Sequence, residues 1–387
     1  MNRELPKLPT LTASIFKSAA VLAGMTALTA EAAVKTWTNG AAAANRLKWI
    51  NPNNWDSTPQ PTTSDTTVFT SSVLIQNTVV TIGNNATTTG KAGQIQFDGA
   101  PTFTVGASTD PYGLSLAGLP DGSGGFLGLV RTATAATDPT STNVQTLFSP
   151  VTLGNTVAFQ IADQSGPGGP GGVVVTGAIG DDVNTYGLTK TGAGRLQLAG
   201  ANTYKGPTAV SAGTLLVNGS NAGGGAFTVG DGTNAATLGG TGAIAGGVTV
   251  ADKATLAPGV AAGTLTVGSL ALANASVLSF DLNQPGSAIP ALGNDLVTVN
   301  GNLVLDGVLN VNAGANFTAG TYALFAYSGA LTNNALAIAA LPNGLSGSVD
   351  ASSPGVVNLV VTPEPATLGL LATGALVGLR RCRHPSV

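Results

Sequence analysis

The stretch that decides the fold is residues 188–219, which read LTKTGAGRLQLAGANTY followed by KGPTAVSAGTLLVNG. Apolar and polar residues alternate around Leu196 and Leu198, as in a strand with one face in a core and the other in solvent. Glycines separate the strand-like runs and allow positive φ at corners. Units of the form GTL and ATL return every 10–25 residues or so, a spacing that suits the coils of a parallel β-helix. Leu198 and Leu215 are predicted to lie in its core.

These residues resemble the autotransporter-associated β-strand repeat over about thirty positions. The matching parts are a Lys-Thr-Gly turn at 190–194, an L-x-L strand at 195–198, an Asn-Thr-Tyr corner at 202–204 and a second strand at 214–218. Weaker echoes continue to Leu272. The resemblance implies a passenger-like β-solenoid. No membrane-barrel sequence follows the repeats, so the chain is expected not to be a complete self-exporting autotransporter.

The predicted fold class is therefore all-β. We expect a right-handed parallel β-helix with an irregular N-terminal cap, flanked by an N-terminal signal helix and a short hydrophobic C-terminal helix. Short strands are predicted in the N-terminal part at 79–82, 94–97, 102–105, 127–130 and 157–161, each bounded by Gly, Pro, Asn or Asp. The predicted order is a signal peptide (1–32), a cap and irregular β region (33–163), a Gly/Pro surface loop (164–172), the β-helix (173–361, clearest at 187–219) and a sorting signal (362–387).

Composition excludes several classes of function. Of 387 residues, 54 are glycine, 9% are charged and 43% are hydrophobic, so the chain can bury a core as disordered chains cannot. Its 15 Lys and Arg form no basic patch, which argues against nucleic-acid binding. The one cysteine, Cys382, and the one histidine, His384, lie in the tail that we expect to be removed. The mature chain would then have no disulfide, no histidine-based triad and no His/Cys metal site, and no cofactor is predicted.

The N-terminus has the pattern of a Sec-type signal peptide. Arg3, Lys7 and Lys17 form a basic region, and residues 18–30 are small and apolar. Ala30 and Ala32 then form an A-x-A cleavage site for signal peptidase. The mature chain is expected to begin immediately after this site.

The C-terminus has a three-part pattern. Pro363, Glu364 and Pro365 precede an apolar run at 366–379, which ends in a basic group. At about 1.5 Å per residue that run would reach only ~21 Å, less than the ~30 Å hydrocarbon core, so it suits transient membrane contact better than a permanent span. The pattern resembles the PEP-CTERM sorting signal. This resemblance implies recognition by an exosortase-like protease and delivery to the surface or extracellular matrix of a Gram-negative-type bacterium. The basic residues of the motif are Arg380, Arg381 and Arg383.

Trp37, Trp49 and Trp55 are all the tryptophans of the chain, and they lie among asparagines and prolines in the N-terminal region. Large aromatic side chains can cover the open end of a stacked core. Tryptophans also stack on sugar rings, so a carbohydrate contact is the alternative. We favour the cap.

Catalysis has little support in the sequence. Polysaccharide lyases and hydrolases need clustered charged groups on one face, whereas glutamate is absent between 33 and 363 and the aspartates are scattered. Asp181 and Asp182 form the one adjacent acidic pair, and a turn is their expected role. We therefore predict an exported, non-enzymatic structural or adhesive protein, which could contact extracellular polysaccharide. The alternative is a carbohydrate-binding or polysaccharide-degrading β-helix.

Overall fold

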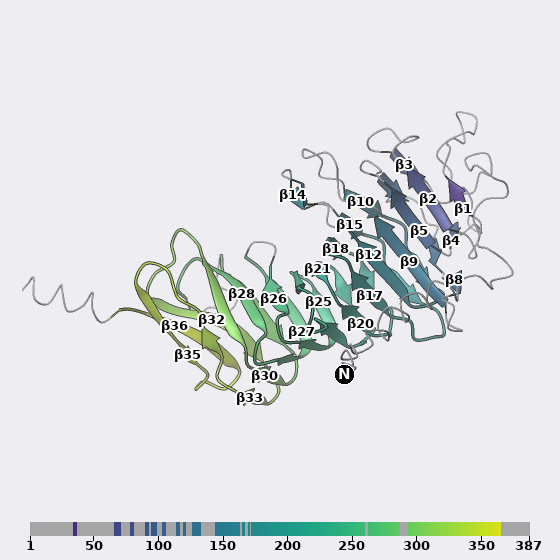
Figure 1. Cartoon of the computed structure of the whole chain (residues 1–387). Coiled ribbons are helices and arrows are strands. Elements are labelled where there is room, and N and C mark those ends of the chain that lie inside the picture. The colour runs from purple at the N-terminus through teal and green to yellow at the C-terminus, as the bar shows by residue number, and fades with distance from the viewer. Residues whose placement is uncertain are drawn as a thin grey trace, which may run out of the picture.

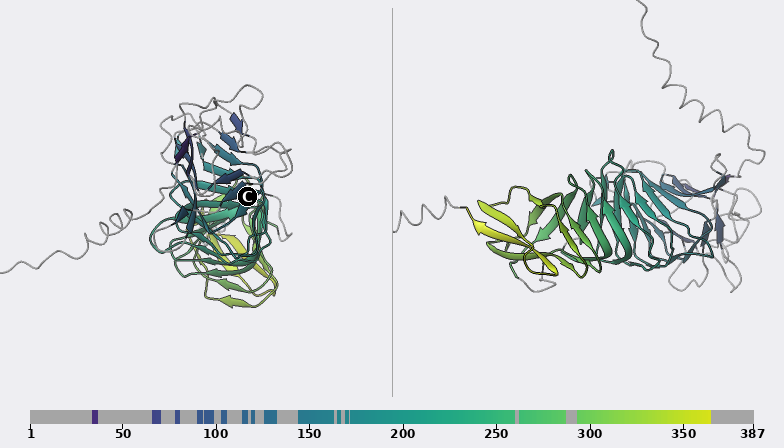
Figure 2. Two further views of the ribbon diagram at one scale, coloured as in Figure 1. Left: turned by 90° about the vertical axis from the view of Figure 1, so that its right-hand side faces the viewer. Right: turned by 90° about the horizontal axis from the view of Figure 1, so that it is seen from below.

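The protein is an elongated stack of β-coils, shown from three sides in Figures 1 and 2. The computed structural model contains strands and no helix among the residues that it describes. Those residues are 34–36, 66–70, 78–80, 90–92, 94–98, 103–105, 114–116, 119–120, 126–132, 144–162, 165–166, 169–170, 172–259, 262–286 and 293–364. The predicted all-β parallel solenoid is confirmed. The two predicted terminal helices lie outside the described residues.

One coil visits three sheets in turn. Strand β10 (Val144–Leu147) belongs to an 11-stranded sheet, β11 (Val151–Leu153) to a 4-stranded sheet and β12 (Val157–Ile161) to a 19-stranded sheet. The next coil repeats this order, and each of its strands pairs in parallel with its counterpart one coil earlier. In two later coils one long strand replaces the separate second and third strands: β25 (Ala243–Val250) pairs with two strands of the coil before it, and β27 (Thr264–Leu272) with two strands of the coil after it.

The other strands follow the same order along the chain. The 11-stranded sheet also contains β3 (Thr78–Val80), β6 (Phe103–Val105), β15 (Gly172–Val175), β18 (Arg195–Leu198), β21 (Gly213–Val217), β24 (Ala236–Gly240), β26 (Thr255–Pro258), β28 (Val277–Leu282), β31 (Val308–Ala313) and β34 (Ala337–Ile338). The 4-stranded sheet also contains β4 (Gly90–Ala92), β7 (Leu114–Leu116) and β16 (Ile179–Asp181). The 19-stranded sheet also contains β1 (Val34–Thr36), β2 (Thr66–Thr70), β5 (Gln94–Asp98), β8 (Leu119–Pro120), β9 (Phe126–Thr132), β17 (Leu188–Thr191), β19 (Ala201–Asn202), β20 (Thr208–Val210), β22 (Ser220–Asn221), β23 (Phe227–Val229), β25 (Ala243–Val250), β27 (Thr264–Leu272), β29 (Leu296–Val299), β30 (Leu303–Leu305), β32 (Gly320–Tyr327), β33 (Leu331–Asn333), β35 (Leu345–Asp350) and β36 (Val356–Pro363).

The core is a set of apolar ladders that run along the axis. In one ladder each residue pairs with the next, one coil further on: Leu196, Leu215, Leu238, Leu256, Leu278 and Leu309. All six are at most 1% exposed. Burying each such side chain contributes about 1.5–3 kcal/mol relative to exposure. Leu198 and Leu215 are both 0% exposed, so their predicted place in the core is confirmed.

The N-terminal region is more regular than the sequence suggested. β1, β2, β5, β9 and β12 form an unbroken parallel ladder in the same sheet as the later coils. The predicted cap and irregular β region, 33–163, thus contains regular parallel strands. The coils escaped notice because long connections separate short strands, so no constant repeat length marks them in the sequence.

The solenoid closes with antiparallel strands. β36 pairs antiparallel with β32 and with β35, so the predicted β-helix does not continue unchanged to residue 361. Val357, Leu359 and Val361 alternate inward on β36 and are at most 2% exposed. The reversed strand thus covers the last coil, where a further parallel strand would leave an open edge. β35 and β36 form the yellow end of Figure 1.

The Gly/Pro segment at 164–172 contains more structure than the predicted surface loop. β13 (Ser165–Gly166) and β14 (Gly169–Pro170) pair antiparallel as a small hairpin. Gly172 is not part of that segment, because it begins β15 and pairs with both neighbouring coils. A Cβ on Gly172 would overlap the Arg195 carbonyl of the next coil, so close packing explains this glycine.

Glycines also form columns at the corners of the coils. Gly177, Gly200, Gly219 and Gly242 occupy the same corner in successive coils, and a Cβ on any of them would overlap a backbone carbonyl of the preceding coil. Positive φ is the reason for glycine at Gly213 (φ 69°), as the sequence suggested. None of the four column glycines has a positive φ. Close approach of neighbouring backbones therefore explains these four.

Candidate ligand-binding groove

Three adjoining hollows form a groove on the outer face and corner of the 11-stranded sheet. The first has a volume of about 650 Å³ and follows the corner from Thr191 to Thr237. The second, about 320 Å³, shares Thr214 and Thr237 with the first and crosses the sheet as far as Asn312. The third, also about 320 Å³, shares Asp281 and Asn312 with the second. The hollows are therefore connected along the solenoid axis.

Small outward-facing residues create the groove. Gly239 pairs with Ala257, so two neighbouring strands have small residues in this row, beside Leu216. Thr214 and Thr237 pair beside this row and form a hydroxyl-bearing wall. A Cβ on Gly239 would overlap the Ala257 carbonyl, so close packing explains this glycine.

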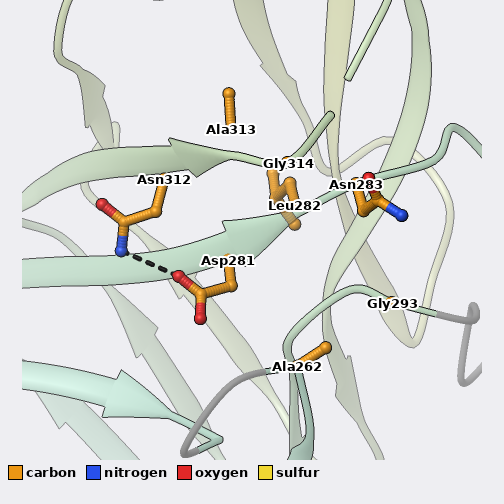
Figure 3. A pocket seen from close by; sticks show the side chains of 8 residues that line it. All are labelled: Ala262, Asp281, Leu282, Asn283, Gly293, Asn312, Ala313 and Gly314. Carbon is orange, nitrogen blue, oxygen red and sulfur yellow. Dashed lines mark hydrogen bonds between the residues drawn. The ribbon is translucent and has the colours of Figure 1, made fainter. Parts of the chain in front are cut away.

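The far end of the groove is polar. Asp281 and Asn312 are paired residues on the neighbouring strands β28 and β31. The Asn312 Nδ2 donates to Asp281 Oδ1 at 2.9 Å, as Figure 3 shows, and also to Ser279 Oγ at 3.1 Å. These contacts hold the two outward side chains in place, with an amide and a carboxylate available to solvent.

Asp295 lines the same hollow as Asp281 and is 1% exposed. Its Oδ2 accepts from the Asp281 N–H at 2.7 Å and its Oδ1 from the Gly263 N–H at 2.9 Å. Burial raises the pKa of Asp295 to about 7, and repulsion by Asp281 adds to this, while the two backbone hydrogen bonds act in the opposite direction. The fold therefore brings together two carboxyl groups that lie fourteen positions apart in the chain.

Asp295 is expected to make the fold pH-sensitive. The folded pKa of about 7 lies above the ordinary value of 3.8, so the folded chain holds a proton that the unfolded chain releases. The stabilisation is complete below about pH 4 and is lost as the pH rises through 7. Because the shift is about three pKa units, the wild type should lose roughly 4 kcal/mol of unfolding free energy between these limits. Asp295→Asn cannot titrate, so its melting temperature should fall less between pH 4.5 and 8, by roughly 5 °C. If the melting temperatures of the two proteins fell equally over this pH range, the assignment would be wrong.

Lys190 lies beneath the first hollow. It is 1% exposed, and its Nζ donates to the carbonyls of Thr191 (3.0 Å), Gly192 (2.7 Å) and Ala212 (3.0 Å). Burial lowers the pKa of Lys190 to about 8. The sequence placed this lysine in a turn, but it belongs to β17 and points into the core between Phe159 and Val210. Its three acceptors span two coils, so it fastens one corner of the solenoid to the next.

Asp181 also differs from expectation. It ends β16 with a side chain that is 1% exposed, and its carboxylate bonds Lys205 Nζ at 2.9 Å and the Lys205 N–H at 2.9 Å. Burial raises the pKa of Asp181, but the hydrogen bonds and charge of Lys205 outweigh that effect and the pKa is lowered. Asp182 has the predicted turn role, because its Oδ1 accepts from the Asn184 N–H at 3.1 Å. The acidic pair thus serves the fold.

Few of the other predicted site residues are described. Pro363 ends β36 opposite Leu345, and the Glu364 N–H donates to the Gly344 carbonyl at 3.2 Å, with both motif side chains exposed. The remaining predicted residues lie outside the described part of the chain: Ala30, Ala32, Trp37, Trp49, Trp55, Pro365, Arg380, Arg381 and Arg383. The apolar run at 366–379 lies outside it as well. Across the described ranges, no helix is long and apolar enough to cross a membrane.

The groove was missed by the sequence reasoning. Asp281 and Asn312 come from neighbouring coils, and only the register of β28 against β31 brings them together. Within the described ranges, no group of three or more His, Cys, Asp or Glu side chains could hold a metal ion. The groove therefore offers hydrogen bonds and a few charges along a shallow, extended path.

Comparisons with known proteins agree with the repeat that the sequence indicated. Residues 188–217 match the family Passenger-associated-transport-repeat. A segment of 117 residues is 51% identical to a protein named Adhesin BmaC autotransporter, from Brucella suis biovar 1 (strain 1330). That segment is 29% of this chain and 3% of the Brucella protein. The predicted autotransporter-associated repeat is thus confirmed for residues 188–217.

Proposed function

We propose that this protein is an exported, non-enzymatic β-solenoid that serves as an adhesive or structural element at the surface of a Gram-negative-type bacterium. The observation that carries this proposal is the place of the repeat: residues 188–217 form coils of an unbroken parallel stack. The similarity to a protein named as an adhesin supports the same function.

The physical properties of the stack suit such a role. Each coil contacts only its neighbours, so the protein can be long and present a large outer surface. The exterior has few charges, since only 9% of all residues are charged. In a parallel stack, like charges on successive coils would lie about 4.8 Å apart and repel.

Delivery to the surface forms the second part of the proposal. Residues 1–32 direct export, and residues 362–387 act as a PEP-CTERM sorting signal that an exosortase-like protease recognises. In support, Pro363 and Glu364 are exposed at the end of the last strand, where a protease could reach them.

Surface display and adhesion can be tested in a Gram-negative host that carries an exosortase. Brief protease treatment of intact cells should digest the protein. Mass analysis of the mature form should show a start after Ala32 and the loss of residues beyond Pro365. Deleting the gene should reduce attachment to surfaces or to other cells. Protein that stays inside cells, or attachment that is unchanged, would refute the proposal.

A polysaccharide-degrading enzyme is the second candidate, and one observation favours it. Asp281 and Asp295 lie together in the groove, and burial raises the pKa of Asp295 to about 7, as a general acid requires. However, both Asp295 oxygens already accept backbone hydrogen bonds, which favours a structural role. Formation of new reducing ends that Asp281→Asn abolishes would establish the enzyme. Binding without turnover would support the adhesive function.

A further inference from the structure

We propose that the groove binds a linear, uncharged polysaccharide lengthwise, parallel to the solenoid axis. This inference deepens the proposed surface function and rests on it, because it gives the adhesive face a location and a ligand class.

The length of the groove suits a polymer. The second hollow alone is lined by residues from β18, β21, β24, β26, β28 and β31, which are consecutive strands of the sheet. Neighbouring strands are 4.7–4.9 Å apart, so this part of the groove extends for about 24 Å. The hollow is shallow and narrow for its length, with a volume of about 320 Å³. An extended chain can follow such a path, whereas a compact small molecule would contact only a fraction of it.

The walls and floor match a hydroxyl-rich chain. Thr214 and Thr237 present hydroxyls on one side, and Asp281 and Asn312 present a carboxylate and an amide at the far end. These groups both donate and accept hydrogen bonds, as sugar hydroxyls do. The floor between them includes Leu216, Ala257 and Pro258, which can contact the C–H faces of sugar rings.

The charge of the groove selects against anionic polymers. Asp231 and Asp281 line the hollows, and Arg195 is the one cation among the described lining residues. Hydrogen bonds from Asn234 and Thr233 lower the pKa of Asp231 to about 2, so it remains ionised. The sequence has no Lys, Arg or His from Ala254 to Leu379, so the far end of the groove has no cationic side chain from this part of the chain. An uncharged glycan pays no electrostatic penalty here, whereas a uronate or sulfated chain would.

The strands beneath the groove do not favour a peptide ligand. Extended peptides usually bind by adding a strand to an open sheet edge. From β18 to β31, each strand that lines the second hollow pairs with the coil before it and the coil after it. Their backbone donors and acceptors are therefore engaged within the sheet, which leaves side chains to form the contacts. Side-chain recognition along a flat path is a common requirement for binding a sugar polymer.

The test compares two tryptophan substitutions in the mature protein. Ala257 is partly exposed on the groove floor, so Ala257→Trp should fill the groove. Ala271 is partly exposed on the outer face of the 19-stranded sheet, so Ala271→Trp adds the same bulk away from the groove. Circular dichroism and melting curves should show that both variants keep the fold.

Electrophoresis through gels containing dextran, laminarin, galactomannan or alginate measures the binding. At least one uncharged polymer should retard the wild type and Ala271→Trp equally, and the affinity of Ala257→Trp should be at least tenfold lower. Alginate, which is anionic, should retard none of them. The inference is overturned if no uncharged polymer retards the wild type, if both variants lose binding equally, or if alginate binds best. Protease treatment of intact cells tests surface display separately, so failure of the groove and failure of the surface function are distinguishable.

Discussion

The Leu215→Asp variant is expected to lose its cooperative fold. Leu215 is 0% exposed and pairs with Leu196 on one side and Leu238 on the other, both of which are buried as well. Removing a buried leucine side chain costs about 2–5 kcal/mol. An unpaired carboxylate in the same place adds a further penalty of several kcal/mol. The sum approaches the entire stability of an ordinary domain, about 5–15 kcal/mol.

Circular dichroism and thermal unfolding of the purified mature chain measure this effect. The expected result is either a chain without a β spectrum or a melting temperature lowered by more than about 10 °C. Thr214→Asp is the matched control, because Thr214 precedes Leu215 on β21 and is partly exposed on the outer side of the sheet. It should change the unfolding free energy by no more than ~0.5 kcal/mol. If Leu215→Asp melted like the wild type, the ladder would be wrongly placed.

The sequence predicted the coils well where local alternation determines them. β18 begins and ends where the L-x-L pattern predicted, and β12 and β28 also match their apolar runs. In these strands one face is buried, so a shift by one residue would expose the whole apolar set. The apolar alternation in the sequence therefore determines the pairing register of these strands.

Apolar alternation did not predict the direction of the closing strand, β36. β36 has the same alternation as the parallel strands, yet it runs antiparallel to β32. Alternation reports which face of a strand is buried, and this face is the same for either direction. Direction is decided by the connection before β36, which here reverses the chain through β35. A pattern of apolar residues alone could not distinguish the two.

The groove could not be predicted for a related reason. Its floor includes Leu216, Ala257 and Pro258, which come from two coils and have no distinctive spacing. Only the pairing register aligns them. The burial of Asp295 could not be predicted from the sequence either. It depends on the Gly263 and Asp281 backbone amides, which donate hydrogen bonds to its carboxylate. Lys190 was noticed as part of the repeat, but its direction into the core depends on the carbonyls of the next corner.

The corner glycines have a clear mechanical role, and it sets the distance between coils. Gly219 lies directly over Gly200, whose carbonyl accepts the Ser220 N–H at 3.1 Å. The Gly219 carbonyl in turn accepts the Ala243 N–H of the next coil at 3.0 Å. A side chain at this position would therefore separate two coils and strain hydrogen bonds on both sides of it.

Gly219→Ala should consequently destabilise the protein by about 3 kcal/mol, a large effect for one methyl group. The new Cβ would overlap the Gly200 carbonyl and the backbone of Ala199, neither of which can move without shifting a whole coil. Gly286→Ala is the matched control, since a Cβ there meets no atom within 4 Å and φ is not positive. The control should be neutral or slightly stabilising, because alanine restricts the unfolded chain. Urea unfolding measures the unfolding free energies of the two variants. If these were equal, the corner would tolerate a side chain, and close backbone packing would not be the reason for glycine at these positions.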